Sequence, residues 1–196
     1  MTDLGELNYF LGMEFTCTET GLILHQRKYV KELLERFNMF VCNPARSPIE
    51  VNLKLMNDKN ETDSEETLFK QIVGSLRFLC NSRPYLSYSV GLISRFMRKP
   101  RRTHMLAAKR VLRYVKGPAD FGILFPFGKR NADEGSLELI GFTDSDHGGD
   151  CVERKSTSGY MFMLNGSPIS WCSKKQPVVA LSSCEAEYIA GSYAAC

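Results

Sequence analysis

The segment from residue 137 onward carries the pattern that restricts the fold most strongly. Apolar stretches bounded by turn residues predict strands over 137–143, 159–164 and 168–172. Asn165-Gly166 joins the second strand to the third, and this dipeptide is the strongest short signal for a hairpin. Ser182 and Glu185 form a capping box, so a helix is expected to follow them. The segment therefore predicts three antiparallel strands and one helix.

Two acidic residues stand where these elements meet. Asp144 follows the first strand, and Glu187 lies in the first turns of the helix, where it can face that strand. Hydrolysis of a phosphodiester by two divalent ions needs several carboxylates that converge on one point. Both residues also have ordinary structural interpretations, Asp144 as a strand-end turn residue and Glu187 as an acid favoured by the helix dipole. Spacing alone leaves both interpretations open.

The first 118 residues predict a β-hairpin followed by helices. Thr103 is the predicted N-cap of the last helix, and Gly117-Pro118 its end. In chain order, the predicted elements are a hairpin over 7–17 and 21–24, a helix over about 27–37, an extended crossing over 42–57, a solvated acidic loop over 58–66, and helices over 69–79, 85–97 and 103–116.

The central part of the chain is strongly basic. Residues 68–119 hold twelve of the 25 Lys and Arg residues and none of the 22 Asp and Glu residues. Four basic residues of the last predicted helix share one narrow sector opposite its apolar face: Arg102, Lys109, Arg113 and Lys116. Most such stripes are merely solvated, but solvated faces usually mix charges of both signs. The absence of acids favours an anionic partner, and a nucleic-acid backbone fits it.

Residues 117–135 are rich in Gly and Pro and end in a polar stretch, which predicts a linker with only a short strand near 121–127. The predicted organisation is a first unit over 1–118, a linker over 119–135 and a second unit over 136–196. The expected fold class is α+β: a β-hairpin with a helical module, followed by an incomplete α/β domain.

Composition excludes several other classes. No stretch of 18 apolar residues is present, and the N-terminal sequence lacks the features of a signal peptide. An intracellular protein, cytoplasmic or nuclear and without membrane contact, is therefore expected. Seven scattered cysteines without a C-x-x-C pair predict free thiols. His147 and Cys151 lack the second pair of ligands that a tetrahedral zinc site requires.

Eight segments follow one another along nearly the whole chain: LNYFLGMEF, GLILHQRKYVKELLERFNM, FKQIVGSLRFL, RPYLSYSVGLISRFM, AAKRVLRYVKG, GFTDSDHGGD, RKSTSGY and SWCSKKQPVVALSSCEAEYIA. Together they resemble the Pol polyprotein of copia-type long-terminal-repeat retrotransposons. The resemblance implies that residues up to about 117 correspond to the reverse transcriptase after its catalytic palm motif, a thumb- or connection-like part. The remainder corresponds to the start of the ribonuclease H domain.

The resemblance also implies roles for individual residues. Asp144 in TDSD matches the first metal-binding aspartate of that nuclease, and Glu187 in EAEY matches its glutamate. Both would bind Mg²⁺, and the implied partner is an RNA·DNA hybrid. The motif neighbours that match no metal ligand are Asp146, Asp150 and Glu185. His147 stands where the family often has tryptophan.

The sequence departs from the family in its catalytic residues. The polymerase site of the family carries paired aspartates, but this sequence contains no Asp-Asp dipeptide. The nuclease of the family uses a third aspartate on a later strand and a further acidic or histidine residue, and neither is matched here. Two carboxylates bind two metal ions poorly. We therefore expect no catalysis by this chain alone, unless other polyprotein segments or a second copy supply the rest.

Two further interpretations stay open. The chain can be a non-enzymatic remnant that binds nucleic acid through the basic module over 68–119, or an inert relic that folds partly or not at all. Loss of low-salt binding after reversal of the four stripe charges would support the first. Absence of a cooperative melting transition would support the second.

Overall fold

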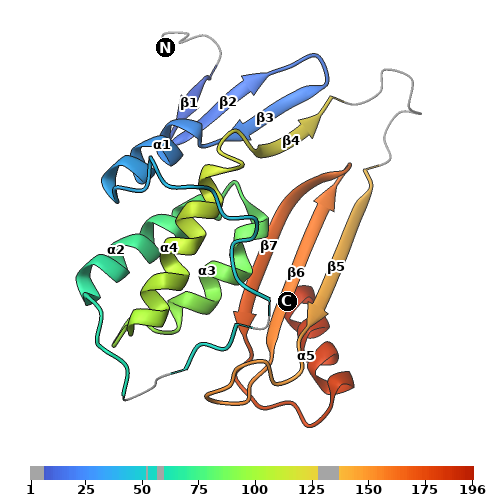
Figure 1. Ribbon diagram of the computed structural model, residues 1–196. Helices are drawn as coiled ribbons and strands as arrows, with labels where there is room; N and C mark the ends of the chain where they lie inside the picture. The colour runs from blue at the N-terminus through green and yellow to red at the C-terminus, as the bar shows by residue number, and fades with distance from the viewer. Residues whose placement is uncertain (1–6, 52, 57–59, 128–136) are drawn as a thin grey trace.

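The computed structural model describes residues 7–51, 53–56, 60–127 and 137–196. Within these ranges the chain forms two antiparallel sheets and five α-helices (Figure 1). Helices α1–α4 pack together beside the first sheet, whereas α5 covers one face of the second. The fold is thus α+β, as the sequence predicts.

The first sheet has four strands in the order β1-β2-β3-β4. Its strands are β1 (Tyr9–Phe10), β2 (Met13–Cys17), β3 (Gly21–His25) and β4 (Gly122–Pro126). A turn at Leu11-Gly12, with positive φ at both residues, divides the predicted strand over 7–17. The prediction of a simple hairpin was incomplete, because β4 pairs along the whole of β3. A Cβ at Gly21 would lie 2.3 Å from the carbonyl oxygen of Phe125, so this pairing requires glycine there.

The helices lie where apolar periodicity predicts them. They are α1 (Arg27–Arg36), α2 (Glu66–Leu79), α3 (Ser87–Ser94) and α4 (Arg102–Lys116), with a 3₁₀ turn η1 (Pro84–Leu86) before α3. The helix predicted over 85–97 is therefore shorter, since its first turn is 3₁₀ and its α-helical part ends at Ser94. The described residues between α1 and α2 contain neither helix nor strand, as Pro44 and Pro48 predict.

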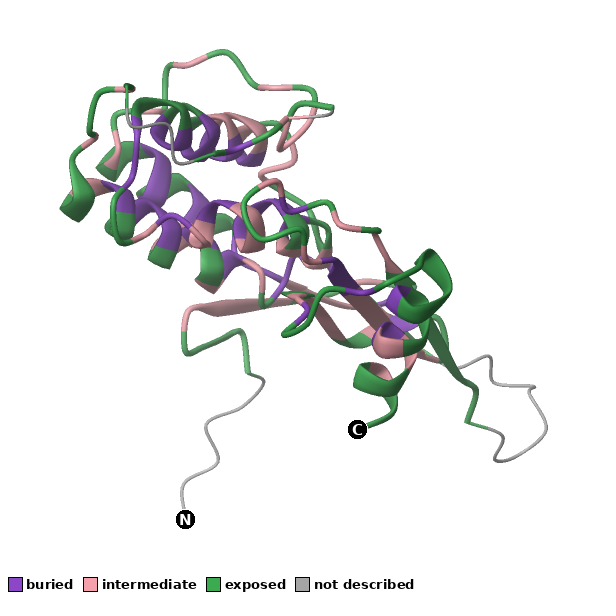
Figure 2. Ribbon diagram, turned by 90° about the horizontal axis from the view of Figure 1, so that it is seen from below, coloured by how far each residue is buried: buried purple, intermediate pink, exposed green. Residues whose placement is uncertain are grey.

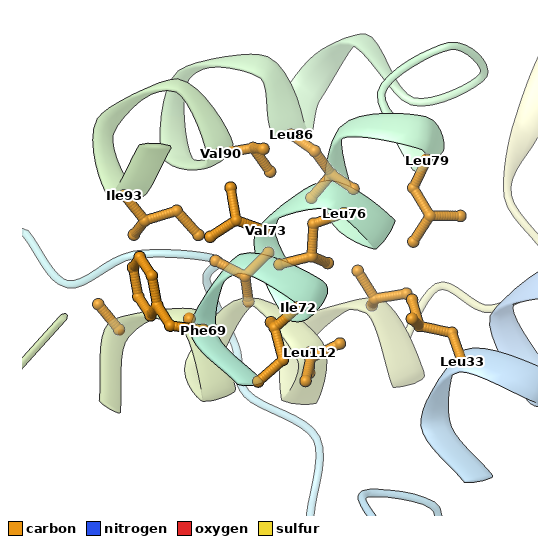
Figure 3. Close-up of a cluster of buried hydrophobic side chains, with 14 of the residues drawn as sticks. Leu33, Phe69, Ile72, Val73, Leu76, Leu79, Leu86, Val90, Ile93 and Leu112 are labelled. Atoms are coloured by element: carbon orange, nitrogen blue, oxygen red, sulfur yellow. The ribbon is translucent and has the colours of Figure 1, made fainter. Parts of the chain in front are cut away.

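The core lies among α1, α2, α3 and α4. Figure 3 shows side chains of these helices pointing toward one another, with those of α2 at the centre. All five apolar positions that predict the buried face of α2 are buried, namely Phe69, Ile72, Val73, Leu76 and Leu79. The buried face of α4 likewise contains the predicted Ala108, Val111, Leu112 and Val115.

The start of α4 differs from the prediction. Arg101, not Thr103, is the N-cap residue, and its backbone N–H donates to Nδ1 of His104. Thr103 instead donates its own N–H and its hydroxyl to the carboxylate of Glu61, at 2.6 and 2.8 Å. Asp63 pairs with Arg101. The acidic stretch predicted as a solvated loop is thus partly tied to α4, because its carboxylates satisfy the first turn of the helix.

The second sheet has the order β5-β6-β7. Its strands are β5 (Leu139–Ser145), β6 (Thr157–Leu164) and β7 (Ser167–Lys175), and helix α5 (Ser183–Ala195) follows. Asn165 and Gly166 have φ angles of 49° and 82°, which confirms the predicted two-residue turn. The hydroxyl of Ser182 accepts the N–H of Glu185, while the carboxylate of Glu185 accepts the N–H of Leu181.

Burial differs between the two parts, as Figure 2 shows by colour. Among the described residues after 136, the only buried apolar side chains are three alanines, Ala180, Ala186 and Ala190. Along β5, every residue but the last is exposed. The second sheet therefore has little core of its own.

Hydrogen bonds join the two parts. The indole Nε1–H of Trp171 on β7 donates to the carbonyl of Cys80 at 2.9 Å, and Ser167 donates to the carbonyl of Leu124 on β4 at 3.0 Å. The boundary predicted between units stays a prediction, because residues 128–135 of the linker lie outside the described residues. The short strand expected near 121–127 is confirmed as β4.

Candidate carboxylate site and basic surface

The structure places Glu187 at the end of β5, next to Asp144. Asp144 is the penultimate residue of β5 and pairs with Gly159 of β6. Glu187 Oε1 accepts a hydrogen bond of 3.3 Å from the backbone N–H of Ser145. Both predicted carboxylates are exposed. Glu187 thus contacts the residue directly after Asp144, although Glu187 and Asp144 are 43 positions apart in the sequence.

The carboxylate of Glu187 lies at the unpaired edge of β5. The N–H of Asp146 donates to the carbonyl of Thr157, on the β6 side. Because successive backbone N–H groups of a strand point in opposite directions, the N–H of Ser145 points away from β6. No other described strand pairs with β5 on that side. Glu187 therefore satisfies a backbone donor that the sheet leaves open.

Asp144 belongs to the sheet face opposite α5. Gln176 Nε2 donates to the hydroxyls of Ser145 and Ser158 and to the carbonyl of Ala186, which places α5 over the Ser145 face. Successive strand residues alternate between faces, so Asp144 projects from the other face. That face turns toward η1 and α3, and Asp144 lines a cavity there. The two carboxylates thus approach the end of β5 from different sides.

Among the described residues, no further acid joins Asp144 and Glu187 to form a larger cluster of possible metal ligands. Within the described residues, the carboxylate of Asp144 has no hydrogen-bond or ion-pair partner, and no group of three or more His, Cys, Asp and Glu side chains gathers anywhere. Mg²⁺ is commonly bound by one or two carboxylates together with water and substrate phosphates. A site for two ions would need further carboxylates.

The neighbouring acids of the TDSDHGGD motif are structural. Asp146 Oδ1 accepts the N–H of Thr157 at 2.7 Å, which closes the loop after β5. Asp150 is buried and lies 3.0 Å from Lys175 Nζ and 3.9 Å from a guanidinium nitrogen of Arg95 on the turn after α3. Burial alone would raise the pKa of Asp150, but the Val152 N–H and Lys175 outweigh it and lower that pKa. Asp150 therefore links the loop to both parts of the protein.

Part of the basic stripe serves the fold. Arg113 Nε donates to the carbonyl of Asn43 at 2.9 Å, and Lys116 Nζ to the carbonyl of Cys42 at 2.7 Å. Both side chains thereby hold the segment that crosses α4. Arg102 and Lys109, the other two stripe residues, are exposed, and their side chains have no hydrogen-bond or ion-pair partner among the described residues. Only half of the predicted stripe is thus available to a ligand.

The basic segment is partly neutralised by acids from outside it. Among the described residues, four acidic side chains pair with cations of residues 68–119: Glu50, Asp63, Glu66 and Asp150. The inference that these cations lack compensating acids was therefore wrong in part. The acids lie elsewhere in the sequence and meet the cations only after folding.

The cysteines behave as predicted. All seven are free. Burial raises the pKa of the Cys80 thiol to about 11, which suppresses the thiolate at neutral pH.

No helix in the described part of the chain is both long and apolar enough to cross a membrane.

Comparison with known proteins identifies the relatives. The chain is 41% identical over 186 residues to the retrovirus-related Pol polyprotein from transposon RE1 of Arabidopsis thaliana, covering 95% of this chain and 12% of that protein. The corresponding polyprotein from transposon TNT 1-94 of Nicotiana tabacum is 40% identical over 98% of this chain and 15% of its own length. An uncharacterized mitochondrial protein of Arabidopsis thaliana is 36% identical over 96% of this chain and 75% of its own length.

These relatives define the class as retrovirus-related transposon polyproteins. The chain belongs to the copia-type Pol polyproteins. It spans 12% of the length of the RE1 polyprotein, a small part of a much longer protein. No family model matches the chain, and no solved structure matches it.

Proposed function

We propose that this chain comes from the region of a copia-type polyprotein where the reverse transcriptase is followed by ribonuclease H. Residues 1–118 would be the part of the polymerase after its palm motif, and residues 136–196 the first three strands and first helix of the nuclease. The order of the eight sequence segments supports this assignment, as does an identity of 41% that extends over 95% of the chain.

The observation that carries the proposal is the approach of Glu187 to the end of β5. The hydrogen bond to Ser145 holds a carboxylate beside Asp144 at an exposed strand end. Asp144 and Glu187 would bind Mg²⁺, which would stabilise negative charge on a scissile phosphate. Asp146 closes the adjoining loop and so fixes the position of the strand end.

Cleavage would require additional carboxylates. Two carboxylates hold two like-charged ions poorly, and the described residues provide no third acid at the site. The unpaired edge of β5 is where another strand can pair and bring such a residue. Other polyprotein segments or a second copy would supply it, so the chain alone would bind its substrate without hydrolysing it.

Binding of an RNA·DNA hybrid would use the exposed part of the stripe. Arg102 and Lys109, which have no side-chain partner in the described part of the chain, would neutralise phosphates, whereas Arg113 and Lys116 donate to backbone carbonyls. Binding through phosphates carries little base specificity and weakens steeply as salt concentration rises. The same surface supports a second candidate function, a nucleic-acid-binding remnant without chemistry.

The deciding experiment follows the RNA strand of a hybrid in Mg²⁺ or Mn²⁺ and measures hybrid binding in the same samples. We expect salt-dependent binding and no cleavage. Cleavage that Asp144→Asn abolishes would show that the site is completed without further segments. Neither binding nor cleavage, together with a missing melting transition, would leave an inert relic.

A matched pair of variants tests the stripe. Arg102→Glu with Lys109→Glu should weaken hybrid binding and lower the slope of log K against log salt by about 2. Lys28→Glu with Lys31→Glu makes the same change in net charge on the exposed face of α1. Equal losses for both pairs would mean that net charge, not the stripe, governs binding.

A further inference from the structure

A cavity of about 410 Å³ lies where the second sheet faces η1 and α3. Tyr85, Tyr88 and Trp171 line it together with Asp144 and Asp146 at the end of β5. Tyr160 of β6 lines it as well, but it pairs with Thr143 and Cys172, so its side chain belongs to the face that α5 covers. The volume falls within the range of about 300–1,000 Å³ that is usual for small-molecule sites. The cavity thus adjoins the proposed metal site on the face that α5 does not cover.

Two of the three rings are held in place. The Nε1–H of Trp171 donates to the carbonyl of Cys80 at 2.9 Å. The hydroxyl of Tyr85 accepts a hydrogen bond from the buried guanidinium of Arg83 at 3.0 Å, and its ring packs edge-on against Tyr114 at 6.0 Å. These contacts fix one wall on the helices and one on the sheet, so little side-chain entropy would be lost on binding.

Tyr88 is the free ring. It is 48% exposed, and within the described residues its hydroxyl has no hydrogen bond and its ring no ring contact. It follows Tyr85 by three positions, so both lie on the same side of η1 and α3. An exposed tyrosine that lines the same cavity as two fixed rings offers a flat apolar surface without a partner among the described residues.

A second cavity of about 610 Å³ shares Tyr88 with the first. Lys54 lines this cavity, and its ammonium group has no ion-pair partner among the described residues. Aromatic walls and the carboxylate of Asp144 also suit a cation, which is Mg²⁺ in the proposed function, whereas Lys54 suits an anion. Glu50 lines the second cavity too but pairs with Arg110 at 2.7 Å, which leaves Lys54 as the unpaired charge among the described lining residues. The two cavities together suit a ligand with a planar ring and a phosphate.

We propose that the cavity binds an unpaired nucleobase of single-stranded RNA or DNA, stacked on Tyr88 between the two fixed rings, with the strand passing toward Lys54. The inference rests on the proposed function and gives it a second kind of substrate contact. Stacking tolerates any base sequence because every base has an aromatic face. A paired base of a hybrid cannot enter, since its faces are covered by its neighbours.

Trp171 is the only tryptophan of the chain, so its fluorescence reports on this cavity. We expect octauridylate and octathymidylate to quench it. Tyr88→Ala should weaken their binding roughly ten-fold, as the loss of one stacked base does. Tyr88→Phe keeps the ring and should bind like the parent. Tyr188→Ala removes an 82% exposed tyrosine from α5 and should have no effect.

Three results would overturn the proposal. The first is single-strand binding that leaves Trp171 emission unchanged, and the second is equal affinity of Tyr88→Ala and the parent. The third is quenching by a trimethyllysine peptide but not by oligonucleotides, which would mark a site for cations. Hybrid binding that depends on Arg102 and Lys109 would then still support the proposed function, whereas loss of all nucleic-acid binding would remove both proposals.

Discussion

The helical core over 30–115 and the three-stranded sheet over 139–175 differ in what they bury. Nineteen apolar side chains form a continuous cluster in the first, drawn from α1–α4, η1, the turn after α3 and the segment between α1 and α2. In the second, backbone hydrogen bonds join the strands, but the apolar residues of β5 remain exposed. Figure 2 shows this as a shift from purple to green and pink.

The difference indicates which part can be stable by itself. Burial of apolar surface is the main favourable term in folding, and the helical part has most of it. The sheet gains stability from contacts with its neighbour, through Trp171, Ser167 and the buried Asp150. The first part should therefore fold independently, while the second depends on the first.

Shortening a side chain in the helical core should lower the stability of the protein most. Leu76 is completely buried at the centre of α2, so Leu76→Ala should lower the free energy of unfolding by about 3 kcal/mol. Leu106→Ala, at a 56% exposed position of α4, should change it by less than about 0.5 kcal/mol. Urea denaturation followed by circular dichroism measures both. Similar losses for the two variants would contradict the assignment of the core.

The next largest effect should come from the charge cluster between the two parts. Asp150→Asn leaves Lys175 and Arg95 without their buried counter-charge, and we expect a loss of about 2 kcal/mol at neutral pH. Glu153→Gln removes an exposed partner of Lys175 and serves as the control. If both variants melt at the same temperature, the buried carboxylate does not join the two parts.

Acid should weaken the same charge cluster, because it protonates the carboxylates. The pKa values of Asp150 and Glu153 are lowered in the folded protein, that of Glu153 to about 2 by hydrogen bonds from Lys155 and Lys175. A group with a depressed folded pKa stabilises the protein above its unfolded pKa. Stability should therefore fall as pH drops below about 4. Asp150→Asn should show a shallower decline in melting temperature between pH 5 and pH 2.

Local patterns predicted most of the fold. Apolar spacing located α2 and α4, Asn165-Gly166 located the hairpin, and Ser182 located the start of α5, because each depends on residues a few positions apart. The approach of Glu187 to β5 followed from strand and helix order together. The folded protein keeps these helices, this turn and this cap, because its tertiary contacts favour the same local structure.

Features that depend on distant residues could not be predicted in this way. β4 pairs with β3, which lies about one hundred residues earlier in the sequence. At the start of α4, the carboxylate of Glu61, 42 positions away, accepts the N–H of Thr103. The partners of Arg113 and Lys116 are backbone carbonyls, which no charge pattern reveals. Tyr85 and Tyr88 gave no signal either, because their cavity exists only where the helices meet the sheet.

Three glycines, one in the helical part and two in the part that contains the second sheet, can be replaced by alanine without a steric clash. A Cβ at Gly166 would meet no atom within 4 Å, so the cost of Gly166→Ala arises from its φ of 82° alone, about 1 kcal/mol. Gly74 in α2 and Gly191 in α5 are equally uncrowded. Replacing either by alanine should stabilise the protein by up to about 1 kcal/mol. Thermal melts that show all three variants destabilised would contradict these backbone conformations.

The hydrogen bond of Trp171 between the sheet and the helical part should contribute least to the overall stability. Trp171→Phe keeps an aromatic ring but removes the donor to Cys80, a loss of about 0.5–1 kcal/mol. Because the sheet depends on the helical part, that loss should appear as earlier exchange of β6 and β7 amides, with α2 amides unchanged. Hydrogen exchange measures both regions in one sample. If α2 and β7 lost protection together, the two parts would unfold as one cooperative unit.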